Sequence, residues 1–120
     1  MSKETQPALQ LPDGITQEQV NAWKEQFGSD KVKLAYLKKD ESGTRIPAVM
    51  HTPTRTVIGE FEKWSDSNPD KAKEILIKGC VLGEATRNDI MASGNDLLFF
   101  SAFNACSKLI PKAESEILNL

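Results

Sequence analysis

The segment from Asn95 to Ile110 constrains the fold most, because apolar residues cover nearly the whole circumference of a helix over this stretch. A helix with no polar side lies either at the centre of a core or at an interface. Pro111 should end or kink it, since a proline removes a backbone hydrogen bond and clashes with the preceding turn. We therefore expect a central helix over 95–110. Core is the preferred interpretation of its Leu97–Phe103 block, and an interface is the alternative.

Residues 16–28 carry the clearest start signal for a helix. Thr16 and Gln19 are spaced as a capping box, in which each side chain satisfies a backbone N–H left unpaired by the first turn. Gly28 suits the left-handed conformation that often follows a helix. A helix of about three turns is expected here, with an apolar stripe at helical spacing. The stripe consists of Val20, Trp23 and Phe27.

A change to a period of two predicts a β-hairpin over residues 31–50. Pro47 cannot donate to a ladder, so the second strand should lie at an edge or pair on one side only. Because a lone hairpin is marginally stable in water, its apolar face should rest on helices. The residues expected on the apolar faces are Val32, Leu34 and Tyr36 in the first strand, and Ile46, Ala48 and Met50 in the second.

Two further helices are expected between the hairpin and the apolar segment, because Thr52-Pro53 and Asn68-Pro69 both combine an N-cap residue with proline at the first helical position. The first carries an apolar stripe and the second ends between Gly79 and Gly83, where we expect small residues to let the chain pass closely. Residues 84–95 are expected to be a polar connection with at most one helical turn, at 89–92. Residues 112–120 are expected to form a short tail helix with Ala113 and Ile117 inward. The stripe of the first helix is Val57, Phe61 and Trp64.

These elements predict an α+β fold, with an N-terminal helix and a two-stranded antiparallel hairpin packed on a small helical bundle. The 120 residues suffice for one domain, which we place at 15–120. Residues 1–14 are polar, contain two prolines and show no period, so they are expected to be a flexible N-terminal segment. A chain of this size can bury a core without a disulfide or a metal.

Composition excludes several classes of function. Fifteen basic and 17 acidic residues give a net charge of −2, which provides no global field for nucleic acid or an anionic membrane. The longest apolar run is too short to span a bilayer, and the N-terminus lacks a secretory segment, so a cytoplasmic protein is expected. Cys80 and Cys106 form no CxxC motif and are expected to be small apolar residues in a reducing compartment.

No motif predicts catalysis or a metal site. Asp66, Asn68 and Asp70 have the spacing of calcium ligands, but Lys71 replaces the required glycine and Ile77 the bidentate glutamate. The only imidazole, His51, has no nucleophile marked for activation and is expected to be a satisfied or solvent-facing histidine at a junction of elements. We therefore expect no catalytic residue, no cofactor and no metal, and a protein that is not an enzyme.

One local feature favours nucleic acid, a basic cluster on the hairpin in which Tyr36 could stack on a base. Asp30, Asp40 and Glu41 flank this cluster and cancel much of its charge. Lysines on an exposed strand also discourage aggregation at the edge of a sheet, which is the preferred interpretation. Nucleic acid is an unlikely partner but the alternative stays open. The cluster consists of Lys31, Lys33, Lys38 and Lys39.

Several segments follow one another along the chain in an order that can be compared with known families. They are WKEQFG, the strand KVKLAYL, PTR opening a helix that ends in FEKW, and NPDKAKEILIKGCVLG. An acidic loop, a very apolar helix and a tail like PKAESEIL complete the series. In this order residues 21–120 resemble small phage and prophage proteins of the tail assembly chaperone type. Similar proteins often carry Asn-Asn-Cys-Trp where this chain has Lys78-Gly79-Cys80-Val81, so the aromatic residue is missing at Val81.

The resemblance implies a non-enzymatic protein of the bacterial host cytoplasm that shields the tape measure protein, or a related phage tail protein, during virion morphogenesis and leaves before the particle is complete. A shielding protein needs apolar surface for its partner, so we expect an apolar groove or a homo-oligomer. The alternatives are a nucleic-acid-binding accessory protein that uses the Lys31–Lys39 hairpin and a structural component of the tail or connector. The candidate partner-binding residues are Phe61, Trp64, Phe99 and Phe103.

Overall fold

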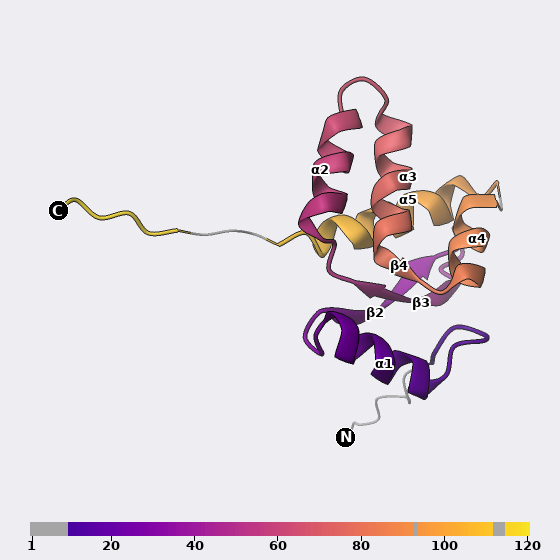
Figure 1. Cartoon of the computed structure of the whole chain (residues 1–120). Helices are drawn as coiled ribbons and strands as arrows, with labels where there is room; N and C mark the ends of the chain where they lie inside the picture. The colour runs from indigo at the N-terminus through magenta and orange to yellow at the C-terminus, as the bar shows by residue number, and fades with distance from the viewer. Residues whose placement is uncertain (1–9, 93, 112–114) are drawn as a thin grey trace.

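A computed structural model describes residues 10–92, 94–111 and 115–120 of the chain (Figure 1). It shows an α+β fold, as predicted, in which a three-stranded antiparallel sheet packs with helices. Its helices are α1 (Gln17–Phe27), α2 (Arg55–Trp64), α3 (Pro69–Cys80), α4 (Glu84–Ala92) and α5 (Asp96–Lys108), and its strands are β2 (Val32–Lys38), β3 (Arg45–His51) and β4 (Val81–Leu82).

The sheet has the order β2-β3-β4. The predicted hairpin is present, with Leu34 opposite Val49 and Leu37 opposite Ile46. The third strand was not predicted, and it makes β3 the central strand rather than an edge. Because β4 pairs only with Val49 and Met50, it ends before reaching Pro47. The missing N–H of Pro47 therefore costs no ladder bond. The expectation that the second strand pairs on one side only was wrong, because β3 pairs with β2 and with β4.

Helices cover both faces of the sheet, so the molecule has three layers (Figure 1). Helix α1 packs on one face over a small cluster formed by Val20, Val32 and Val49. The other four helices lie on the opposite face, over the main core. The buried residues of that core are Leu37, Ala48, Met50, Leu76, Ile77, Cys80, Val81, Ile90, Leu98, Ala102 and Cys106.

Both faces of β2 are covered by helices. The face predicted to point inward packs on the small cluster under α1, and the other face packs on the main core. Val32 and Leu34 pack toward α1, whereas Ala35 and Leu37 face the main core. Tyr36 was expected inward, but 43% of its side chain is exposed and its hydroxyl accepts a hydrogen bond from the backbone N–H of Gln10. The prediction failed because it assumed one covered face, whereas α1 and α5 cover opposite faces of the same strand.

Helix α5 is a core helix along one side only. Leu98, Ala102 and Cys106 are buried and α5 contacts both α3 and β2. Phe99 and Phe103 are partly buried at the margin of the core, and 52% of Phe100 is exposed. The block from Leu97 to Phe103 therefore contributes to the core on one side and to the surface on the other.

Two segments differ from the prediction. Residues 84–92 form the full helix α4 instead of a connection with one turn, because Thr86 and Ile90, one helical turn apart, are both buried. Residues 115–120 form neither helix nor strand, and Ile117, expected inward, is 91% exposed. The rest of the predicted tail helix, with Ala113, lies outside the described residues. Of the segment 1–14, residues 10–14 are described, and Leu11 packs against the cluster under α1.

No helix in the described part of the chain has both the length and the apolar character needed to cross a membrane.

Candidate functional site

The candidate partner-binding residues lie on α2 and α5, and the structure brings two of them into contact. The rings of Phe61 and Phe103 have centroids 6.0 Å apart and are tilted by 42°. Phe99 forms an edge-to-face contact with Phe100, which was not a predicted site residue, at 5.7 Å. Trp64 lies instead against Lys71 of α3. We call Phe61, Trp64, Phe99, Phe100 and Phe103 the aromatic surface.

The helix ends explain how α2 is held in place. The Thr54 hydroxyl accepts a hydrogen bond from the N–H of Val57 at 3.3 Å, so Thr54 is the N-cap and α2 begins at Arg55. The predicted N-cap at Thr52 was wrong by two residues, because the N–H of Thr52 still donates to the carbonyl of Lys31 at the end of the hairpin. Asn68 caps α3 in the same way, through the N–H of Lys71 at 3.2 Å. Each side chain satisfies one of the four N–H groups that a helix start leaves unpaired. The two capped helices then pack against each other as a hairpin.

Lysines border the aromatic surface. The ammonium group of Lys71 lies 3.8 Å from the centre of the Trp64 ring, and that of Lys73 lies 5.5 Å from the Phe103 ring. A cation over a ring face is attracted by the negative charge of the π system. The surface thus offers apolar rings edged by positive charge, a combination that suits a partner carrying apolar and acidic side chains.

Phe100 is the residue that sequence reasoning missed. It belongs to the apolar block, but helical spacing from Phe99 and Phe103 places it about 100° around the helix from Phe99 and away from the core. At 52% exposure it is the most exposed aromatic side chain among the described residues. The sequence did contain a signal for it, because apolar residues occur on all sides of this helix. Where such a helix packs against the core on one side, the apolar residues of its other side are exposed.

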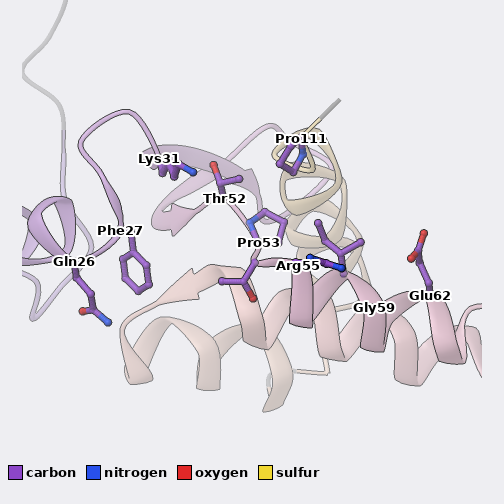
Figure 2. Close-up of a pocket in the computed structure, with 11 residues that line it drawn as sticks. Gln26, Phe27, Lys31, Thr52, Pro53, Arg55, Gly59, Glu62 and Pro111 are labelled. Atoms are coloured by element: carbon purple, nitrogen blue, oxygen red, sulfur yellow. The ribbon is translucent and has the colours of Figure 1, made fainter. Parts of the chain in front are cut away.

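A hollow of about 660 Å³ lies elsewhere, between the end of α1, the connection after β3 and the first turns of α2 (Figure 2). Lys31, Arg55 and Glu62 place charges of both signs around it. Next to it, the rings of Phe27 and His51 stack with centroids 4.1 Å apart and planes 4° apart. No signal in the sequence pointed to this hollow, because its lining comes from four separate segments.

His51 is the satisfied histidine of the two alternatives that the sequence left open. It is buried, and its Nδ1 lies 2.8 Å from the carbonyl oxygen of Thr52. A carbonyl only accepts, so Nδ1 carries the proton and donates. With one face of the ring covered by Phe27, this side chain ties the end of β3 to the end of α1.

The predicted basic cluster is spread along β2. Strand geometry places Lys31 about 25 Å from Lys39, since a strand rises ~3.3 Å per residue. Lys31 lines the hollow beside α2, and the carbonyl of Lys39 accepts a hydrogen bond from the side-chain amide of Asn95. The backbone N–H of Lys38 donates to the hydroxyl of Ser101 at 2.8 Å. Only Lys33 lies exposed in the middle of the strand.

The acidic and sulfur-containing candidates serve the fold. Asn68 caps α3 and Asp70 lies in its first turn, as the cap interpretation of this acidic segment requires. Cys80 and Cys106 are both buried free thiols, and the hydrogen bond between their side chains raises the pKa of Cys106, with burial adding to the effect. In the described part of the chain, no group of three or more His, Cys, Asp or Glu residues could hold a metal ion.

Comparison with known proteins extends to the fold alone. The solved structure of an uncharacterised protein from Bacillus stearothermophilus is similar, with a TM-score of 0.54 and 17% sequence identity. The similarity covers 82% of this chain and 98% of that one. No family model matches the sequence, and no curated protein matches it significantly.

Proposed function

We propose that this chain is a non-enzymatic protein of the tail assembly chaperone type, which binds a phage tail protein such as the tape measure protein and shields it in the host cytoplasm during virion morphogenesis. The order of segments from WKEQFG to PKAESEIL supports the phage part of the proposal. The aromatic surface supports the binding of a polypeptide.

The exposure of Phe100 is the observation that supports the proposal most directly. Its half-exposed ring stands beside Phe99 on a helix whose opposite side is core. Covering this ring with a partner would recover on the order of 1 kcal/mol of burial free energy. A shielding protein gains from such a residue because it binds an apolar segment that its partner later buries in the assembled tail. The neighbouring lysines keep the surface soluble and favour acidic segments.

Co-expression with the tape measure protein of the same phage tests the proposal. The wild-type chain should raise the soluble fraction of that protein and be recovered with it on a tag. Phe100→Ser should lose most of this effect while keeping the helical circular dichroism of the wild type, because the ring is largely outside the core. Tyr36→Ser is the matched control, since it removes an aromatic side chain that is 43% exposed on β2.

Unchanged solubility of the tape measure protein, together with no recovery of a complex, would contradict the proposal. Mass spectrometry of purified virions separates a chaperone from a permanent tail component. The proposal expects the chain to be absent from finished particles and present in infected or induced cells. Stoichiometric amounts in the virion would instead assign it a structural role.

A further inference from the structure

The outer edge of β2 is open. Thr52 N–H donates to the carbonyl of Lys31, and Lys39 N–H donates to that of Thr44, so the odd-numbered residues of β2 form the hydrogen-bonded pairs with β3. The even-numbered residues direct their backbone groups away from β3. Among the described residues, Ser101 caps the outward N–H of Lys38, and no hydrogen bond reaches those of Val32, Leu34 and Tyr36.

A groove runs along each side of this open edge. The groove on the α1 side, of about 230 Å³, lies between β2 and the α1 positions Gln17, Val20 and Lys24, which share one helix face. The groove on the α5 side, of about 400 Å³, is lined from α5 by Ser101, Asn104, Ala105 and Lys108, which also share one face. A strand added to β2 would place alternate side chains in the two grooves.

Both grooves are positively charged, in contrast to the net charge of −2 of the whole chain. Lys24 brings positive charge to the first. Lys33, whose side chain the strand alternation places on the α5 side, lines the second together with Arg45 and Lys108. Their described linings contain no carboxylate. The edge therefore suits a strand that carries apolar residues and negative charge. A direct β2–β2 pairing between two copies would bring the same lysines together and is disfavoured.

The chain itself contains a segment of this kind. Residues 115–120, Ser-Glu-Ile-Leu-Asn-Leu, include one acidic residue and no basic residue. Ile117 is 91% exposed and Leu118 is 74% exposed, and Leu120 has no cover at all. In an extended strand Glu116, Leu118 and Leu120 share one face, and Ile117 lies on the other. Figure 1 shows this segment leading away from the sheet of its own chain.

We propose that residues 115–120 of one copy add as a strand to the open β2 edge of a second copy. Leu118 and Leu120 occupy the groove beside α1, against Val20, Val32 and Leu34, and Ile117 enters the groove beside α5. Glu116 then lies beside Lys24, which orients the added strand parallel to β2. The main-chain hydrogen bonds satisfy the outward groups of Val32, Leu34 and Tyr36. This proposal concerns self-association and is independent of the aromatic surface.

Sedimentation equilibrium of the full chain, combined with amide hydrogen exchange measured by NMR, tests it. The wild type should dimerise as its concentration rises. The outward N–H groups of Val32, Leu34 and Tyr36 should then exchange at least about tenfold more slowly than in the dilute monomer. A variant with Leu118→Asp and Leu120→Asp should be a monomer with fast exchange at these positions and an unchanged circular dichroism spectrum, because both leucines are exposed in the monomer.

Charge reversal tests the orientation. Glu116→Lys and Lys24→Glu should each weaken the dimer, and the double variant should restore it. Phe100→Ser removes a different exposed apolar side chain and should leave the dimer unchanged, so loss of tape measure binding and loss of dimerisation are measured separately. Three results would overturn the proposal: a monomer at all concentrations, a dimer that persists in the Leu118→Asp, Leu120→Asp variant, or protection of the β2 amides within a monomer.

Discussion

The backbone of Gly79 on α3 lies directly against the side chain of Val57 on α2. A β carbon at Gly79 would lie 2.5 Å from Cγ1 of Val57 and 2.8 Å from its Cγ2, which is closer than any real contact between such atoms. Gly79 therefore lets α3 approach α2 closely at Val57, within a pair of helices that form one hairpin (Figure 1). The aromatic surface depends on this packing, because Phe61 reaches Phe103 only when α2 lies close to α3.

Gly79→Ala should destabilise the fold. In an exposed helix, replacing glycine by alanine gains about 1 kcal/mol, but here the added methyl group overlaps Val57, and overpacking typically costs about 1–3 kcal/mol. A net loss in the free energy of unfolding is expected in urea titrations. Gly59→Ala on α2 is the matched control, since its β carbon meets no atom within 4 Å, and it should stabilise by about 0.5–1 kcal/mol.

A second variant separates overlap from other effects. When Val57→Ala is combined with Gly79→Ala, the double variant should recover part of the stability lost in Gly79→Ala, because Val57→Ala removes both overlapping methyl groups. If Gly79→Ala were as stable as Gly59→Ala, the proposed contact between the backbone of Gly79 and the side chain of Val57 would be contradicted.

Ser101→Ala should weaken the end of β2. The Ser101 hydroxyl accepts from the backbone N–H of Lys38 at 2.8 Å in a partly buried position. Its removal leaves that N–H without a partner, at a cost of about 1–2 kcal/mol. Ser107→Ala is the control, because its hydroxyl only donates to the Phe103 carbonyl within the same helix. Faster amide exchange at Lys38 should accompany the loss, and equal stability of the two variants would count against it.

Thr16→Ala should destabilise α1 by about 1 kcal/mol. The Thr16 hydroxyl accepts from the N–H of Gln19 at 3.2 Å, and the Gln19 side chain accepts from the N–H of Thr16 at 3.0 Å. Thr16→Ser keeps the oxygen and should retain most of the stability. Thermal unfolding followed by circular dichroism measures the difference, and an alanine variant as stable as the serine variant would show that the box contributes nothing.

Local chemistry was the part of the fold that sequence could predict. The Thr16–Gln19 capping box and the Asn68 cap are present as predicted, because they depend on side chains within three residues of each other. The cap expected at Thr52 lies at Thr54 instead. The hairpin is present for the same reason, since its turn is short and Asp40 accepts hydrogen bonds from the backbone N–H groups of Ser42 and Thr44. The hydroxyl of Ser42 also donates to the Asp40 carboxylate, and this hydrogen bond, followed by that from the N–H of Thr44, lowers the pKa of Asp40.

Long-range contacts decided what the sequence could not predict. Val81 and Leu82 form a strand only because β3 presents Val49 and Met50 to them, and two residues carry no period of their own. Helix α4 exists because Ile90 reaches the main core, although most of its residues are polar. In the candidate site, Phe61 and Phe103 could be proposed from apolar stripes, but the exposure of Phe100 depends on which side of α5 meets the core.

Cys106 should make the fold sensitive to alkaline pH. Its hydrogen bond with Cys80, and then burial, raise the pKa of the Cys106 thiol far above its ordinary value of 9.0. Above pH 9 the unfolded chain loses this proton while the folded chain keeps it, so the free energy of unfolding should fall by up to ~1.4 kcal/mol per pH unit. Below pH 9 Cys106 keeps its proton in both states, so its contribution to the free energy of unfolding does not change with pH. Urea titrations between pH 7.5 and 10.5 measure the slope, and Cys106→Ala, which lacks the thiol, should decline less steeply. Parallel curves for the two proteins would mean that the thiol ionises equally well in the folded core.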